Sequence, residues 1–286
     1  MPHDTPDTGS VPPIAEGKTK RVYAHPTDPT KVFLASKDDI TAGDGAQRDV
    51  IPGKGAWANQ TTCNVFRLLQ AHDVPLAFLR EAGTDLFLAR KCRMLPYEVV
   101  VRRAAYGSYL KRNPNFEKGY RFPQLIVEFF LKTAGKEWKQ YDLPCDDPLM
   151  SFRLPNLIGL HDPAKPASTP PFCRLRYDEV FTTQNEHEHF PAMETITQNA
   201  FLLLEVAWQR QSCTLVDFKV EFGIDSTGAL LLADVIDNDS WRVIEDGVHL
   251  DKQQYREGSG LDAVAATYRR VAEMTDLFPP RVEIAS

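Results

Sequence analysis

The clearest alternation of apolar and polar residues runs through LVDFKVEFG, residues 215–223. A period of two is typical of a strand with one buried face, so this segment predicts a strand. The pattern places four apolar side chains on one face and three charged side chains on the other, Asp217, Lys219 and Glu221. Two carboxylates on a half-buried face repel each other and lose hydration. We therefore expect a cation between Asp217 and Glu221, either Lys219 or a metal ion.

A second strand is expected to pair with the first. The segment GALLLADVI, residues 228–236, follows a turn at 225–228, so it can return antiparallel and bring Asp234 near Glu221. Two carboxylates without cysteine or histidine favour Mg²⁺ over zinc. A structural ladder of ion pairs is the alternative interpretation.

Other apolar runs predict further elements of both kinds. Residues 20–24 and 31–36 flank a turn and predict a hairpin. Strands are also expected over residues 76–79, 85–89, 97–101 and 125–131. Helical spacing predicts helices over residues 56–71, 193–208 and 261–274, with a short helix over 107–112 that ends before Pro114.

Two regions show little periodicity. Residues 1–13 are rich in proline, threonine and aspartate and predict a flexible tail, with order beginning near Ile14. The many prolines that follow Asp147 predict a surface excursion over about 149–192, either an inserted loop or a flap beside a cleft. A chain of 286 residues is long enough for two lobes around a cleft or for one large domain.

Composition narrows the class of protein. Hydrophobic residues make up 43% of the chain and charged residues 25%, as in ordinary globular proteins, and the net charge is -6. This acidity argues against a nucleic-acid partner. The chain has neither a membrane-spanning apolar run nor a signal peptide, so we expect a cytoplasmic protein with no membrane partner. Five cysteines without a C-x-x-C pair predict reduced thiols, and the polar stretch around His187 and His189 predicts a solvated loop.

A basic turn precedes the first hairpin, in Gly17-Lys18-Thr19-Lys20. Glycine frees the backbone, and lysines at i and i+2 project from one side of a strand, where they could clamp a polyphosphate. The spacing does not match a Walker loop. A solvent-exposed basic turn is the alternative.

An anion site is predicted over residues 94–108. Arg102 lies near the end of a strand, and Gly107 and Ser108 open the next helix. A guanidinium group, a hydroxyl and unpaired backbone N–H groups together suit one phosphate or carboxylate. An ordinary helix N-cap with a nearby surface arginine is the alternative.

The polar segment DNDSWR, residues 237–242, follows closely on Asp234. Its density of aspartate and asparagine predicts an Asx turn. From this turn Arg242 could reach an anionic substrate.

Six motifs resemble the SAICAR synthetase (phosphoribosylaminoimidazole-succinocarboxamide synthase) family in order and spacing, over about residues 15–258. They are Gly17–Lys20, Asp39–Asp44, Pro96–Ser108, Phe130–Lys132, Leu215–Gly223 and Asp234–Arg242. The runs at 233–241 and 111–114 are similar in style to the animal-type branch, in which this domain is fused to a carboxylase. We expect no fused carboxylase, because 286 residues leave no room for one.

The resemblance implies an α+β, two-lobe fold related to the ATP-grasp enzymes, with antiparallel sheets, flanking helices and ATP in the cleft between lobes. An ATP-lid lobe is expected over residues 14–96 and a catalytic lobe over 97–286. Such enzymes join carboxyaminoimidazole ribonucleotide (CAIR) to L-aspartate and hydrolyse ATP to ADP and phosphate, and the expected cofactor is Mg²⁺.

The resemblance also implies roles for single residues. ATP binding falls to Gly17, Lys18, Lys20, Met94 and Lys132. Substrate binding falls to Asp44, Arg102, Ser108, Asp239 and Arg242. Glu221 and Asp234 would hold Mg²⁺, and Asp217 and Lys219 would lie at the reacting groups, where Asp217 is a candidate base.

The chain departs from the family pattern at three places. Tyr97 stands where an aliphatic residue is usual, and Tyr106 stands where threonine or alanine usually precedes Gly-Ser. The connection over residues 132–147 is long, and either Asp146 or Asp147 is the counterpart of the family's Asp-Pro pair. These departures motivate an alternative function, an ATP-dependent amide ligase of the same fold that takes a different carboxylate or amine.

Overall fold

The structure is a computed structural model that describes most of the 286-residue chain. The described residues are 6, 11–42, 47–133, 135–154, 156–181, 183, 185–278 and 280. Most of the expected tail at 1–13 lies outside them. Within them, no helix is long and apolar enough to cross a membrane.

The chain divides into two compact units. Unit 1 comprises residues 1–93, 202–215 and 223–286, and unit 2 comprises residues 94–201 and 216–222. The expected lobe boundary at 96 lies close to the first crossing, but most of the chain after Phe201 groups with unit 1. Each unit is therefore built from several segments of the sequence, whereas each expected lobe was one continuous segment.

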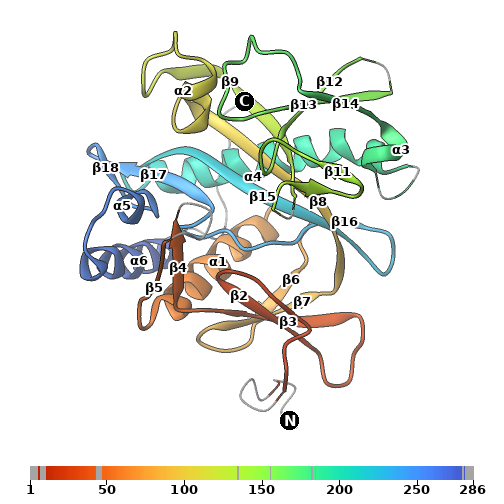
Figure 1. The fold of residues 1–286 in the computed structure, drawn as a ribbon. Helices are drawn as coiled ribbons and strands as arrows, with labels where there is room; N and C mark the ends of the chain where they lie inside the picture. The colour runs from red at the N-terminus through yellow and green to blue at the C-terminus, as the bar shows by residue number, and fades with distance from the viewer. Residues whose placement is uncertain are drawn as a thin grey trace. The chain divides into compact units, whose positions relative to one another are not determined.

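Unit 1 contains a five-stranded sheet in the order β1-β2-β3-β7-β6 (Figure 1). Its strands are β1 (Ala15–Glu16), β2 (Lys20–Ala24), β3 (Lys31–Ser36), β6 (Phe78–Glu81) and β7 (Leu86–Arg90). The predicted hairpin is confirmed, because β2 and β3 pair antiparallel with Val22 opposite Leu34. Strands β6 and β7 confirm the next two predictions within a few residues.

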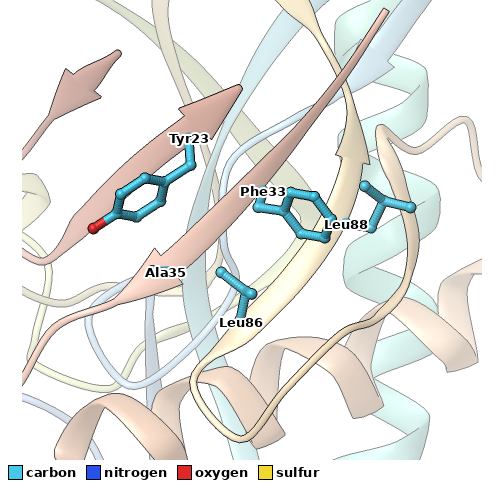
Figure 2. Packing of buried hydrophobic residues seen from close by; sticks show 5 residues of the cluster. All are labelled: Tyr23, Phe33, Ala35, Leu86 and Leu88. Atoms are coloured by element: carbon cyan, nitrogen blue, oxygen red, sulfur yellow. The ribbon is translucent and has the colours of Figure 1, made fainter. Parts of the chain in front are cut away.

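Alternation gives this sheet two apolar faces. One face holds a cluster of five buried residues, Tyr23, Phe33, Ala35, Leu86 and Leu88 (Figure 2). The other face packs on α1 (Lys54–Gln70), where the ring of Phe66 lies 5.3 Å from that of Phe78 and 6.1 Å from that of Phe87. Burial of both faces fixes the register, since a one-residue slip would exchange them.

Helix α6 (Leu261–Asp276) packs against α1 in the same unit. A second core joins Val264 and Tyr268 of α6 to Ile40, Ile51 and Tyr255. Unit 1 also contains β4 (Asp39–Ala42), β5 (Gln47–Val50), α5 (Gln253–Arg256), β16 (Leu230–Leu232), β17 (Trp241–Glu245) and β18 (Val248–His249). As predicted, β16 pairs with β15 (Thr214–Asp225) after a tight turn.

Unit 2 contains strands in the order β14-β13-β12-β9-β8-β15 (Figure 1). Their bounds are β8 (Cys92–Ala104), β9 (Arg121–Leu131), β12 (Leu149–Leu154), β13 (Leu157–His161) and β14 (Cys173–Arg176), with β15 as above. Strand β8 pairs antiparallel with β9, with Glu98 opposite Phe130. Helix α4 (Phe190–Gln209) covers apolar side chains of this sheet, with the ring of Phe201 lying 5.7 Å from that of Phe218.

Much of the region over 149–192, expected as a surface excursion, forms regular structure. Strands β12, β13 and β14 extend the sheet antiparallel from β9, followed by α3 (Tyr177–Val180) and the 3₁₀ helix η2 (Glu186–His189). Met150, Ile158, Leu160 and Leu175 are buried. The strands are short and separated by prolines, so their period of two spans too few residues to appear in the sequence.

The remaining elements are small. They are α2 (Ser108–Arg112), β10 (Glu137–Trp138) and β11 (Tyr141–Asp142). Helix α2 ends before Pro114, as predicted. The fold is thus α+β with antiparallel sheets and flanking helices, which confirms the expected class.

Candidate active site

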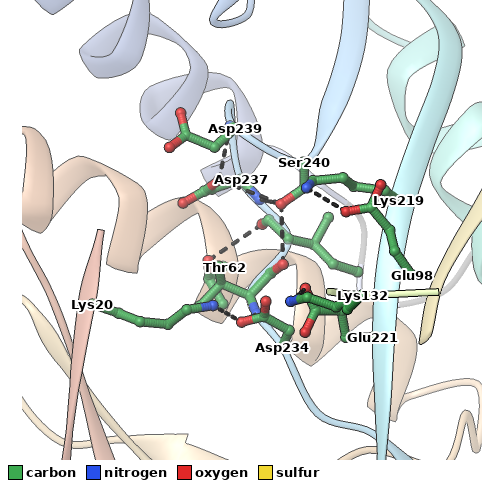
Figure 3. Close-up of polar contacts among 12 residues, drawn as sticks. Lys20, Thr62, Glu98, Lys132, Lys219, Glu221, Asp234, Asp237, Asp239 and Ser240 are labelled. Carbon is green, nitrogen blue, oxygen red and sulfur yellow. Dashed lines mark hydrogen bonds and ion pairs between the residues drawn. The ribbon is translucent and has the colours of Figure 1, made fainter. Parts of the chain in front are cut away.

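The charged face of β15 belongs to unit 2, and each of its three side chains pairs with a residue of β8 or with Lys132, which follows β9. Lys219 Nζ donates to Glu98 Oε2 at 2.6 Å, and Lys132 forms an ion pair with Glu221 (Figure 3). Residues on β8 and after β9 therefore balance charges of this face. Which cation lies between Asp217 and Glu221, Lys219 or a metal ion, stays a prediction.

Asp217 is the most deeply buried member of this face. Only 4% of the residue is exposed, and its Oδ2 accepts a hydrogen bond from Arg102 Nη1 at 2.8 Å. Arg102 also donates from Nε to Glu128 Oε2 at 2.7 Å. The two carboxylates raise the pKa of Arg102 despite its burial, so the guanidinium stays charged.

Ser108 lies in reach of the same guanidinium. Arg102 Nη2 donates to Ser108 Oγ at 3.3 Å. Gly107 precedes Ser108 with φ 54 and ψ -130, a conformation that favours glycine. The residues of the sequence-predicted anion site, Arg102 and Ser108, thus lie together, and Ser108 follows a backbone conformation that glycine adopts readily.

Lys132 follows β9 directly, and two aspartates hold the next residue. Thr133 N donates to Asp147 Oδ1 at 2.8 Å, and the Thr133 hydroxyl donates to Asp146. Burial, with the nearby charge of Asp146, raises the pKa of Asp147. Both candidates for the family's Asp-Pro pair therefore hold the loop beside Lys132, a role that their spacing in the sequence did not reveal.

The two tyrosine departures occupy different surroundings in unit 2. Tyr97 is fully buried, donates its hydroxyl to Glu186 and packs its ring 4.9 Å from that of Phe190. Tyr106 lies against the Lys118–Gly119 turn, with Lys118 Nζ 5.5 Å from the ring centre. Met94, the predicted adenine contact, is 44% exposed at the start of β8.

In unit 1, Lys20 forms an ion pair with Asp234 (Figure 3). Lys20 is the first residue of β2, and Asp234 follows β16. Asp234 Oδ1 also accepts from Val235 N at 2.7 Å, which fixes the carboxylate against its own backbone. Two residues that the sequence separates widely are thus brought together.

The segment after Asp234 forms the predicted Asx turn. Asp237 Oδ1 accepts from Asp239 N at 2.8 Å, and Ser240 Oγ donates to Val235 O at 3.1 Å. Thr62 of α1 donates to Ile236 O at 3.3 Å (Figure 3). Burial and the charge of Asp239 raise the pKa of Asp237.

Asp239 lies in a pocket of cations and one hydroxyl. Lys252 Nζ lies 3.4 Å and Lys54 Nζ 3.9 Å from Asp239 Oδ2, and Tyr268 donates its hydroxyl to Oδ1. Burial opposes ionisation, but the two lysines and Tyr268 hold the pKa of Asp239 at about 2. Lys54, the first residue of α1, is only 1% exposed, and no motif around it in the sequence indicated this role.

The basic turn lies before β2 rather than in it. Gly17 N donates to Lys20 O at 2.9 Å, so Lys18 sits in the bend and strand alternation does not relate it to Lys20. Lys18 lines a cavity of about 480 Å³ in this unit together with Lys37 and Arg48. An excess of cations in a hollow suits an anionic ligand.

Of two further predicted substrate-binding residues, the structure describes only one. Asp44 lies outside the described residues. Arg242 is the second residue of β17 and is half-buried.

The two predicted magnesium ligands are carboxylates with oxygens that Mg²⁺ prefers. Glu221 is paired with Lys132 in unit 2, and Asp234 is paired with Lys20 in unit 1. Among the described residues, no group of three or more histidine, cysteine, aspartate or glutamate side chains could hold a metal ion. One or two carboxylates suffice for Mg²⁺ when substrate phosphates complete the coordination, so each carboxylate by itself is a donor of the kind that Mg²⁺ takes with a nucleotide.

Comparison with known proteins gives a consistent family. A family model for SAICAR synthetase matches residues 13–142 and 174–275. The phosphoribosylaminoimidazole-succinocarboxamide synthase of Roseiflexus sp. (strain RS-1) is 41% identical over 274 residues, covering 93% of this chain and 96% of that protein. The bifunctional phosphoribosylaminoimidazole carboxylase/phosphoribosylaminoimidazole succinocarboxamide synthetase of Homo sapiens is 39% identical and covers 93% of this chain, which spans 58% of that protein.

A solved structure supports the same assignment. A SAICAR synthetase (Type-2) in complex with ADP matches with a TM-score of 0.72 and 28% sequence identity. The match covers 93% of this chain and 98% of that one. Sequence and fold agree over nearly the whole length, and the chain belongs to the SAICAR synthetase family.

Proposed function

We propose that this chain is the ATP-dependent ligase of purine biosynthesis that joins CAIR and L-aspartate to give SAICAR, ADP and phosphate. The similarity over 93% of the chain to a named phosphoribosylaminoimidazole-succinocarboxamide synthase is the observation that carries the proposal. The ADP complex of a related structure supports a nucleotide as one substrate. The residues implied by the family motifs support the chemistry that follows.

The reaction needs an activated carboxyl group. A carboxylate is a poor acyl donor, because oxide is a poor leaving group and the negative charge repels a nucleophile. We propose that a carboxylate oxygen of CAIR attacks the γ-phosphorus of ATP and expels ADP, which leaves an acyl phosphate. The amine of aspartate then attacks the acyl carbon, phosphate departs, and the amine loses a proton to form the amide.

Unit 2 supplies groups for the ribonucleotide and the nucleotide. Arg102 and Ser108, which are 3.3 Å apart, would bind the phosphate of CAIR. Asp217 holds the Arg102 guanidinium at 2.8 Å, so we propose that it positions Arg102. Lys132 would lie along the nucleotide with Met94 beside adenine, and Lys219 would face the reacting groups.

Unit 1 supplies a second set of groups. Gly17, Lys18 and Lys20 would contact the phosphates of ATP, where lysine charge stabilises the transferred phosphoryl group. Asp239, held by Lys54 and Lys252, and Arg242 would contact the ribonucleotide. Asp44 is proposed for substrate binding from the sequence alone.

We propose Glu221 and Asp234 as ligands of Mg²⁺. When bound, the ion would neutralise charge on the phosphate oxygens of ATP. A lysine accompanies each carboxylate, Lys132 beside Glu221 and Lys20 beside Asp234.

Mass analysis of the products tests substrate and reaction type together. With ATP, Mg²⁺, CAIR and L-aspartate, we expect SAICAR and ADP in equal amounts, and omission of any substrate should abolish both. Turnover with another carboxylate or amine, but none with this pair, would favour the alternative ligase. A stable phosphorylated product formed without any amine would indicate a kinase and reject the proposal.

A further inference from the structure

A cavity of about 600 Å³ lies in unit 2 apart from the residues assigned above. Strands β12 and β13 and the segment after His161 form most of its wall, with β9, Arg112 and Glu194 completing it. Most of this wall falls between residues 142 and 174, which the family model leaves unmatched. The cavity is therefore built largely by a part of the chain outside the common family pattern.

Arg112 presents the first sign of a ligand. Its side chain is 2% exposed and forms an ion pair with Glu128, yet Nη1 is buried without a hydrogen-bond partner among the described residues. A buried donor without a partner costs free energy, and a guanidinium has no neutral form to adopt. An acceptor at the cavity wall would satisfy it.

Two aromatic side chains present the second sign. Phe152 is 39% exposed and Phe172 is 36% exposed, and both line the cavity. Phe152 packs edge-on to Phe129, another lining residue, with ring centres 6.0 Å apart. Large apolar side chains gathered around a hollow are typical of a binding pocket.

The charges around the cavity leave a positive group unpaired. Lys165 has no ion-pair partner in the part of the chain that the structure describes. Two acids of the wall already accept hydrogen bonds, Asp162 from Ala164 N at 2.8 Å and Glu194 from Gln198 at 3.3 Å. Ser151 and His161, 3.0 Å apart, add polar groups that can orient a ligand.

We propose that this cavity binds a small molecule with an aromatic body and one acidic group, a carboxylate or a phosphate. The aromatic body packs between Phe152 and Phe172, and the acidic group is held by Lys165 and Arg112. The inference stands on unit 2 alone and is independent of the proposed function.

Isothermal titration calorimetry of the full chain with phenyl phosphate and with benzoate tests the proposal and distinguishes the two acidic groups. We expect at least one probe to bind with saturation. Lys165→Gln and Phe172→Ala should each weaken binding about tenfold, the loss of one charge-assisted hydrogen bond or one aromatic contact. Lys111→Gln, an exposed lysine beside Arg112 and outside the lining, is the matched control and should bind as the wild type does.

Three outcomes would overturn the proposal. One is that neither probe binds the wild type at millimolar concentration. Another is that Lys165→Gln and Phe172→Ala bind as tightly as the control. The third is that ADP with Mg²⁺ displaces the probe competitively or that inorganic phosphate binds equally well, since the probe would then occupy the nucleotide site or a simple anion site.

Discussion

Arg102 and Asp217 form a buried ion pair, with Nη1 and Oδ2 2.8 Å apart and each residue less than 5% exposed. Strands β8 and β15 are neighbours in the sheet, so the pair joins two segments more than a hundred residues apart. The pairing makes Asp217 a holder of the guanidinium, whereas the sequence favoured it as a base. The two roles predict different kinetics.

Asp217→Asn keeps a hydrogen-bond acceptor for Arg102 and removes the charge. We expect KM for CAIR to rise about tenfold with a smaller change in kcat. The reason is that the substitution disturbs the orientation of the guanidinium and does not remove a catalytic base. Steady-state kinetics across pH measure this. A fall in kcat of about 10²-fold or more with loss of one limb of the pH profile would instead identify Asp217 as the base.

Glu221→Gln tests the proposed magnesium ligand. The amide is a weaker ligand for a hard cation, so the Mg²⁺ concentration for half-maximal activity should rise at least about tenfold. Titration of activity with Mg²⁺ at saturating ATP gives this value. Glu117→Gln, a change to an exposed glutamate in unit 2, should leave the titration unchanged. An unshifted curve for Glu221→Gln would remove this residue from the ligand set.

Long periodic segments could be predicted from sequence because each repeats its pattern over several residues. Helix α4 and strand β15 are examples, since one buried face dictates both period and position. The hairpin β2–β3 could be predicted because its turn residues stand between two apolar runs. Strands β12 to β14 could not, because each has no more than six residues and prolines interrupt the region.

The sequence could predict which residues belong to the candidate site, but only in part which of them contact one another. Asp217, Lys219 and Glu221 do share one face, yet their partners lie on β8 and just after β9, and spacing within one strand does not encode pairing with another. Lys54 shows the same limit, because only the packing of α1 on α6 places it beside Asp239.

Asp239→Asn should lower stability in a pH-dependent way. The folded pKa of about 2 is depressed from 3.8, so the carboxylate stabilises the fold above pH 4 and loses this contribution as the pH falls through 2. At pH 7 we expect a loss of about 2 kcal/mol in the free energy of unfolding. The difference between the variant and the wild type should become smaller as the pH falls from 4 to 2. Urea unfolding at several pH values measures it.

Asp246→Asn is the control for this series, since Asp246 is an exposed acid in the same unit. Its free energy of unfolding should stay within about 0.5 kcal/mol of the wild type at pH 7. A difference between Asp239→Asn and the wild type that does not change with pH would show that the ion pairs with Lys54 and Lys252 add no net stability.

Gly107→Ala tests whether the backbone conformation of Gly107 positions Ser108. Alanine at φ 54 and ψ -130 should cost about 1–3 kcal/mol in the free energy of unfolding, because a Cβ disfavours this conformation. A backbone shift that relieves the strain introduced by alanine would move the Ser108 hydroxyl away from Arg102, so KM for CAIR should rise. Gly247→Ala, at φ 82 in the turn between β17 and β18, should lose stability while KM stays unchanged. Equal KM values for the two variants would mean that Gly107 serves the fold alone and that Ser108 does not depend on it for binding.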